Sequence, residues 1–293
     1  MRRIKVIALA ALAMLTLAGC GGGGGPAPGV VRMAVTDLQG MEELQREFGA
    51  FVTELERASG LQVEFYPVNN RVAAAGALAG DQVDLVFTGP AEYVVLHERT
   101  DAEPLIGIRR PDYHSCIYTS RDSGITRIDQ LRGKKIAMSD IGSTSGHLGP
   151  SQLLVDAGLD PQRDLEVLTV GDAQHQALVR GDVAAVGAGC HDYAEFTAKV
   201  PDAAAAFPIL VEGPPLPPDI VMVRAGLDPR IVEQIRTAFE QNFPALLAAM
   251  LTGEDNAKYG NAELVAVRDG DYDVVRSMYR AIGVADTTEF VGE

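Results

Sequence analysis

Lys135-Ile136-Ala137-Met138 predicts a β-strand, Gly142-Ser143-Thr144-Ser145-Gly146-His147 a loop, and Gln152-Leu153-Leu154-Val155 the helix that follows. The first N–H groups of a helix have no partner within it, and the helix dipole places partial positive charge there. Three hydroxyl residues between two glycines at this point suit an anion, because the glycines admit a close approach and the hydroxyls donate hydrogen bonds. The same residues also fit a plain helix N-cap, and the loop alone does not decide between the two.

The alternation of strands and helices continues on both sides of this stretch. Strands are predicted at 30–35, 61–66, 83–87, 116–119, 135–138, 165–170, 183–186 and 219–223, and helices at 41–59, 72–79, 128–131, 173–180 and 229–251. Helices between short apolar strands indicate mainly parallel sheets covered on both faces. We predict an α/β fold with two lobes, in which the Pro-rich segment 203–218 is the return crossing. Lobe 1 comprises 30–110 plus 208–293, lobe 2 comprises 111–207, and the ligand cleft lies between them.

The N-terminus predicts export and a membrane anchor. Three basic residues precede an apolar run at 6–17 that is too short to span a membrane, so residues 1–19 fit a signal peptide. Leu17-Ala18-Gly19-Cys20 resembles a bacterial lipobox, in which cleavage precedes a cysteine that is then lipidated; an ordinary secretory signal ending in cysteine is the alternative. Residues 20–29 are rich in Gly and Pro and form a tether. We expect an exported lipoprotein of the cell envelope, held to the membrane by lipid.

The chain is strongly acidic. Its 40 Asp and Glu residues against 25 Lys and Arg give a formal net charge of −15, which becomes −18 when the three basic residues of the signal peptide are removed. Such a chain lacks the basic surface that neutralises phosphate groups, so we expect no nucleic-acid partner. An anionic ligand must then be held by local donors against the overall field.

Two cysteines, Cys116 and Cys190, remain besides Cys20. They belong to no CxxC pair and to no His/Cys cluster, so a structural zinc site is not expected, and no cofactor is predicted. In an oxidising compartment two cysteines most simply form a disulfide.

Four separated parts of the chain share a pattern with one family. Val83 to Tyr93 combines a strand with Gly-Pro-x-x-Tyr, and Asp122 to Ile125 is followed by Leu131 to Lys134 at the entry to the second lobe. Gly142 to Gly146 matches that family's signature at its anion site, and Asp271 to Arg276 resembles its C-terminal run. Together they resemble the phosphonate-, phosphite- and phosphate-binding proteins of bacterial ABC importers, the PhnD-like group of the type 2 periplasmic-binding fold. The resemblance implies a receptor that captures a small oxyanion and delivers it to an ABC permease in the membrane.

The resemblance also implies ligand-binding residues from both lobes. Tyr93 would donate its phenol O–H from the first lobe, and the hydroxyls of the signature would hold the ligand from the second. The candidates are Ser143, Thr144, Ser145, Tyr93, Arg71, Asp192, Gly142, Gly146, His147 and Tyr113.

Two of these candidates bear on which oxyanion is bound. Arg71 stands where the family often has an aromatic residue, and a guanidinium fork suits a small tetrahedral oxyanion, whereas an aromatic wall suits the organic tail of a phosphonate. Asp192 stands where the family often has an acidic contact. Its carboxylate would accept the proton of a monoprotonated oxyanion and repel sulfate. Phosphate, phosphite and small phosphonates remain the predicted ligands.

Two other functions are weighed against transport. Relatives of the family bind arsenite through cysteine and signal to a membrane kinase, so a free thiol of Cys116 or Cys190 in the cleft would favour a periplasmic sensor. A disulfide between them would argue against it. An enzyme would need Cys116 as nucleophile and His114 as base, but no third group is evident, so no enzymatic activity is expected.

Overall fold

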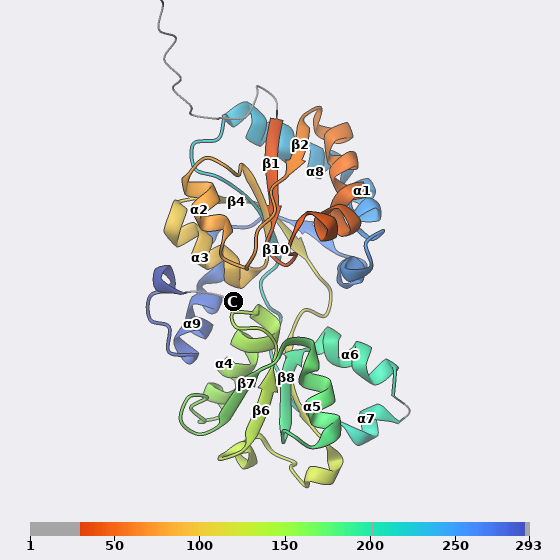
Figure 1. Cartoon of the computed structure of the whole chain (residues 1–293), viewed down its shortest axis with the longest axis vertical. Coiled ribbons are helices and arrows are strands. Elements are labelled where there is room, and N and C mark those ends of the chain that lie inside the picture. The colour runs from red at the N-terminus through yellow and green to blue at the C-terminus, as the bar shows by residue number, and fades with distance from the viewer. Residues whose placement is uncertain (1–29, 201, 291–293) are drawn as a thin grey trace, which may run out of the picture.

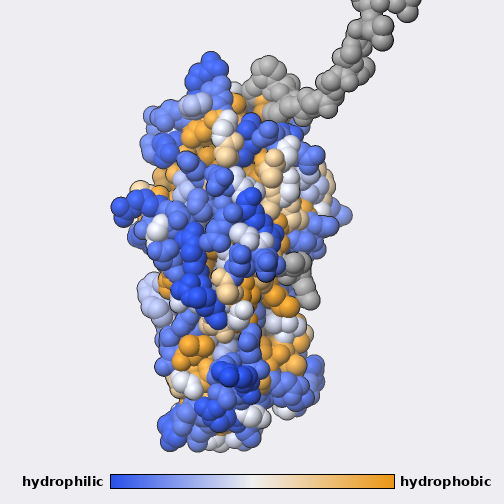
Figure 2. All heavy atoms as spheres, turned by 90° about the vertical axis from the view of Figure 1, so that its left-hand side faces the viewer, coloured by the Kyte–Doolittle hydropathy of each residue, from blue (hydrophilic) through white to orange (hydrophobic). Residues whose placement is uncertain are grey.

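The computed structural model describes residues 30–200 and 202–290 as two α/β lobes, one above the other in Figure 1. The predicted signal peptide, the predicted lipidation site Cys20 and the predicted tether lie outside the described residues. No helix among the described residues is both long and apolar enough to cross a membrane. On the face shown in Figure 2, hydrophilic residues predominate and hydrophobic ones lie in small groups.

The first lobe is built on a six-stranded sheet of order β11-β4-β10-β3-β1-β2. Its strands β1, β2 and β3 pair in parallel, whereas β10 runs antiparallel to β3 and β4 because the chain enters it from the second lobe. The strands are β1 (Val30–Val35), β2 (Gln62–Phe65), β3 (Leu85–Thr88), β4 (Glu103–Arg109), β10 (Asp219–Val223) and β11 (Glu263–Val265). The helices are α1 (Met41–Ser59), α2 (Ala74–Ala79), α3 (Pro90–Thr100), α8 (Pro229–Met250) and α9 (Asp273–Ala281).

Both faces of this sheet are covered, as its apolar strands require. In α1 the residues Leu44, Phe48, Phe51 and Leu55 recur every three or four positions, so they share one face of the helix. That face is buried against the sheet together with Phe239 of α8. A second buried cluster joins α2, α3 and α9 to the opposite side of the sheet. The sheet is thus held between two helical layers, and its strand ends are left to face the second lobe.

The second lobe contains a five-stranded sheet of order β7-β6-β8-β5-β9. Strands β6, β7 and β8 are parallel, and β5 is antiparallel to both β8 and β9. Its strands are β5 (Ser115–Thr119), β6 (Lys135–Met138), β7 (Glu166–Thr169), β8 (Ala185–Gly189) and β9 (Ile209–Glu212). Its helices are α4 (Gly149–Asp156), α5 (Gln174–Arg180), α6 (Cys190–Ala198) and α7 (Ala203–Ala206).

The predicted α/β fold with two lobes is confirmed, with one difference at the return crossing. Residues 209–212, which the sequence assigned to the first lobe, form β9 and pair with β5 of the second sheet. A short strand at the edge of a sheet tolerates neighbouring prolines, because only one side of it pairs. The chain therefore crosses between the lobes at 110–114, between β4 and β5, and at 213–218, between β9 and β10.

Candidate ligand-binding cleft

A cleft of about 490 Å³ lies between the lobes, and residues from both lobes line it. Asp37 and Gly89 follow β1 and β3, and Ser139 follows β6, so the cleft opens at the carboxyl ends of parallel strands in both sheets. This is where ligands bind in open α/β sheets, because loops lead there into the starts of helices. The cleft combines residues that lie far apart in the sequence.

The signature loop has the backbone of a helix start. Gly142 has a φ of 87°, a left-handed conformation that favours glycine, and its N–H donates to Nδ1 of His147 at 3.2 Å. A Cβ at Gly146 would lie 2.5 Å from Cβ of Ser139, so only glycine fits there. The Ser143 hydroxyl accepts the Gly146 N–H at 3.3 Å, which is an N-cap, and Ser143 also lines the cleft. The N-cap interpretation of this loop is confirmed, and the anion site stays a prediction.

Thr144 joins the two lobes at the cleft. Its Oγ1 accepts the N–H of Ala91 at 3.0 Å, in the first turn of α3. Thr144 and Ser145 begin the helical segment that continues into α4, and both are buried. Two helix N-termini, one from each lobe, thus converge on the same place, and both add partial positive charge there.

Arg71 lies in the cleft but is engaged by carboxylates. Its Nη1 donates to Asp37 and to Glu92, each at 2.7 Å, and its Nη2 lies 3.6 Å from Asp140 of the second lobe. Burial raises the pKa of Glu92 more than Arg71 lowers it. Burial would also raise the pKa of Asp37, but Lys258 and Arg71 outweigh it and hold that pKa below its usual range. The charge of Arg71 is therefore largely neutralised within the protein.

The base of the cleft contains a second arginine, Arg110, that the sequence analysis missed. Its guanidinium carbon lies 3.5 Å from the centre of the Tyr113 ring, and its Nη2 donates to Asp219 at 3.1 Å. Asp219 also accepts the hydroxyl of Tyr259 at 2.7 Å. The signal in the sequence was a basic residue directly after a strand, at the carboxyl edge of a sheet.

In the second lobe, Asp192 lies in the first turn of α6 and lines the cleft with His191. Asp192 accepts the N–H of Gly189 at 3.2 Å, and Nε2 of His191 lies 3.2 Å from its carboxylate. Burial raises the pKa of Asp192, and burial of His191 lowers the pKa of that imidazole to about 4. His191 is thus neutral near pH 7.

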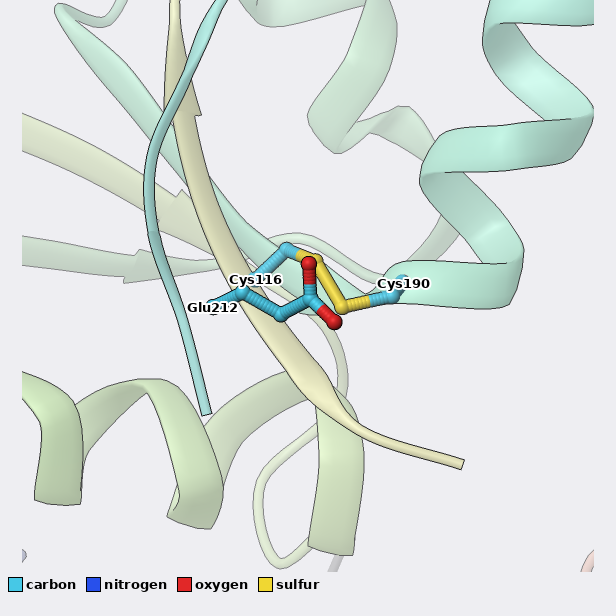
Figure 3. A group of neighbouring side chains, drawn as sticks. All are labelled: Cys116, Cys190 and Glu212. Atoms are coloured by element: carbon cyan, nitrogen blue, oxygen red, sulfur yellow. A yellow bond between two sulfur atoms is a disulfide. The ribbon is translucent and has the colours of Figure 1, made fainter. Parts of the chain in front are cut away.

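A disulfide between Cys116 of β5 and Cys190 of α6 holds the start of that helix against the sheet, as Figure 3 shows. Glu212 lies beside it, and its carboxylate and the two sulfurs are within 4.8 Å of one another. Disulfide sulfurs are not the thiolates that bind metals or metalloids. Neither cysteine lines the cleft.

Four of the predicted ligand residues do not line the cleft. Tyr93 is fully buried on another face of α3, where its hydroxyl donates to Asp269 at 3.0 Å and its ring packs on Tyr272. The preceding residue, Glu92, lines the cleft instead. Gly142, Gly146 and His147 instead stabilise the backbone of the signature loop, since the N–H of Gly142 donates to His147 and the N–H of Gly146 donates to Ser143. Ser143, Thr144, Ser145, Arg71, Asp192 and Tyr113 do line the cleft.

The cleft is acidic as a whole. Among the described residues its lining holds ten acidic side chains, but only Arg71, Arg110 and Lys258 carry fixed positive charge. An anion bound there would have to be held by specific donors and not by the general field, in agreement with the charge of the chain.

Comparison with known proteins places the chain among transport proteins. A family model described as ABC transporter, phosphonate, periplasmic substrate-binding protein matches residues 33–242. The phosphate-import protein PhnD of Mycolicibacterium smegmatis is 23% identical over 294 residues, covering 87% of each chain. The tetrathionate sensor histidine kinase TtrS of Salmonella typhimurium is 34% identical over 97 residues, 30% of this chain and 16% of that one. The structure of PhnD1 from Prochlorococcus marinus in complex with methylphosphonate has a TM-score of 0.69 at 16% identity, covering 88% of this chain and 100% of that one.

Proposed function

The chain belongs to the family of periplasmic phosphonate substrate-binding proteins of ABC transporters, and from this premise we propose that it captures a small phosphorus oxyanion between its lobes. The cargo is phosphate, phosphite or a small phosphonate, and the protein hands it to a membrane permease. Members of this family bind and deliver a substrate and are not enzymes.

The convergence of two helix N-termini at Thr144 carries this proposal. An oxyanion beside Thr144 would accept hydrogen bonds from the hydroxyls of Ser143, Thr144 and Ser145, since each hydroxyl that accepts a bond within the protein still has its own proton to donate. The partial positive charge at the starts of both helices stabilises a bound anion. Because these two helix starts belong to different lobes, capture favours the closed arrangement.

The acidic lining favours a protonated oxyanion. A ligand that keeps an acidic proton donates it to a carboxylate of the cleft, whereas a fully ionised anion leaves two negative charges facing each other. Asp192 is the proposed acceptor of that proton, and it would discriminate phosphate and phosphite from sulfate. The names of the relatives agree with such cargo, since one imports phosphate and another was solved with methylphosphonate.

Sensing through the same cleft is the second candidate, favoured by the similarity of 97 residues to a tetrathionate sensor kinase. A sensor of arsenite would require a free thiol in the cleft. The disulfide between Cys116 and Cys190 argues against an arsenite sensor, because it removes both thiols.

We also propose that Cys20 is lipidated and that residues 20–29 tether the lobes to the membrane. A Cys20→Ser variant tests this anchor, because the lipidated wild-type chain stays with membranes during fractionation and the variant is released.

Calorimetric titration of the full chain in detergent tests the proposed function. Phosphate, phosphite, methylphosphonate, sulfate and arsenite are added in turn, with and without a thiol reductant. Tight binding of a phosphorus oxyanion in either redox state, with weak binding of sulfate, is the expected result. Binding of arsenite alone, and only after reduction, would overturn it in favour of a sensor.

A further inference from the structure

Arg110 occupies the junction between the first lobe and the crossing to the second. It directly follows β4, and its side chain is only 8% exposed at the base of the cleft. Its guanidinium stacks on Tyr113, which also lines the cleft. Asp219, its ion-pair partner, begins β10 at the end of the return crossing. The pair therefore links the two segments that connect the lobes.

The hydrogen bonding of Arg110 is incomplete. A guanidinium has five N–H donors, and burying one without an acceptor costs free energy. Its Nη2 donates to Asp219, but its buried Nε has no partner among the described residues. The one carboxylate bonded to Arg110 already accepts the Tyr259 hydroxyl as well. The site thus lacks an acceptor beside a buried positive charge.

Arg71 differs in this respect, although both arginines line the cleft. Three carboxylates surround Arg71, and two of them accept its Nη1 at 2.7 Å. An additional anion beside Arg71 would lie next to Asp37 and Glu92 and be repelled. At Arg110 the hydrogen-bonded carboxylate is Asp219, which is shared with Tyr259, while Asp37 acts on Arg110 without a hydrogen bond, so the repulsion there is smaller.

We propose that Arg110, not Arg71, is the charged residue that binds the oxyanion, and that Arg71 instead neutralises the acidic groups of the cleft. The ligand supplies the acceptor that the buried guanidinium lacks, while the hydroxyls of the signature loop bind it from the second lobe. This inference rests on the proposed function. Because Arg110 lies on one crossing and Asp219 directly follows the other, binding at Arg110 also acts directly on the connections between the lobes.

The test compares two neighbouring arginines in the full chain. Arg109→Gln is the matched control, because this substitution removes the same charge outside the cleft. Arg109 is 58% exposed and pairs with Glu263. Titration with inorganic phosphate, phosphite and methylphosphonate should show a loss of about 50-fold or more in affinity for Arg110→Gln, as for a buried charge-assisted contact. Arg109→Gln should stay within about twofold of the wild type. Small-angle scattering should show that the ligand no longer compacts Arg110→Gln.

Arg110→Lys is the second variant, and it keeps the inference testable if Arg110→Gln fails to fold. Lysine retains the charge beside Asp219 but lacks the planar fork, so a loss of about fivefold to tenfold in affinity is expected in a variant that still folds. If the wild type binds one of these anions and the folded Arg110 variants bind it with an affinity within about twofold of the wild type, this inference is wrong but the proposed function stands. A wild-type chain that binds none of the three anions would overturn the proposed function and this inference with it.

Discussion

The backbone N–H of Ala91 in the first lobe donates to the Oγ1 of Thr144 in the second lobe at 3.0 Å. This bond joins the first turn of α3 to the start of the helical segment that leads into α4. Thr144 accepts a bond that holds the lobes together, and in the proposed function it also donates its own proton to a ligand in the cleft. Closure and the proposed ligand binding would then share one side chain.

Thr144→Val should weaken both functions of this side chain. Valine keeps the shape of threonine but removes the acceptor for Ala91 and the donor for the ligand, so the affinity for the best phosphorus oxyanion should fall about tenfold to a hundredfold. Calorimetry measures the affinity, and small-angle scattering measures how far the ligand compacts the chain. Thr144→Ser retains the hydroxyl and is the control. Equal affinity of the valine variant and the wild type would contradict the assigned role.

Asp192 should make the affinity for sulfate depend on pH. Burial raises its pKa above the ordinary value of about 3.9, so lowering the pH from 7 protonates Asp192 earlier than a solvated aspartate. Sulfate stays fully ionised over that range, and its affinity should rise as the negative charge of Asp192 is lost. Asp192→Asn should bind sulfate about tenfold more tightly at pH 7 and show a flat pH profile. If the variant kept the wild-type profile, another carboxylate would be the discriminating group.

His147 should limit stability in acid. Its Nδ1 accepts the N–H of Gly142, which requires a neutral ring, and burial lowers its pKa from 6.5 to about 4. The unfolded chain takes up this proton near pH 6.5 and the folded chain only near pH 4. The stabilisation is therefore complete above pH 6.5 and is lost as the pH falls toward 4, by about 3 kcal/mol for this one group.

Urea unfolding at pH 7 and at pH 5 measures this effect. His147→Gln cannot be protonated, so its free energy of unfolding should fall less between the two pH values than that of the wild type. The comparison at pH 7, where both side chains are neutral, corrects for any loss of packing in the variant. Parallel declines in the two proteins would show that other groups cause the acid sensitivity.

Local patterns sufficed for most of the fold. The bounds of α1 were predicted to the residue, because a regular apolar face is followed by Gly60, which ends the helix in a left-handed conformation at φ 71°. The prolines around β9 hid a short strand whose only support is pairing with β5. Such pairing depends on residues about ninety positions away, and no local pattern expresses it.

The site was harder to predict from the sequence than the fold, and the reason is geometric. One step along a helix turns a side chain by about 100°, so the family element at 89–93 was insufficient to tell whether Glu92 or Tyr93 faces the cleft. The role of Arg71 likewise depends on Asp37 and Asp140, which come from separate loops. Arg110 escaped notice because its place at the cleft depends on Asp219, which the return crossing brings beside it.

Asp84 should be the most sensitive acidic residue of the first lobe. It is fully buried, and it pairs with Arg224 at 2.7 Å and with Arg32 at 3.4 Å. Asp84→Ala leaves both guanidinium groups without this carboxylate, so the free energy of unfolding should fall by about 3–5 kcal/mol. Asp81→Asn is the control, because Asp81 pairs with Arg224 while 71% exposed and should cost less than about 1 kcal/mol. Similar losses of unfolding free energy in the two variants would show that the burial of Asp84 does not make its ion pairs more important for stability than an exposed pair.

The disulfide should contribute stability and little affinity. Cys116 and Cys190 are separated by 74 positions in the chain, and a cross-link over a loop of this length stabilises by about 4 kcal/mol in the chain-entropy account. The start of α6 keeps other supports, since the N–H of Cys190 donates to the carbonyl of His114 at 2.9 Å and Ser115 pairs with Gly189. The double variant Cys116→Ser/Cys190→Ser should therefore unfold at lower urea concentration but bind phosphate within about threefold of the wild type. A collapse of affinity in a variant that is still folded would mean that the disulfide itself positions His191 and Asp192 for the ligand.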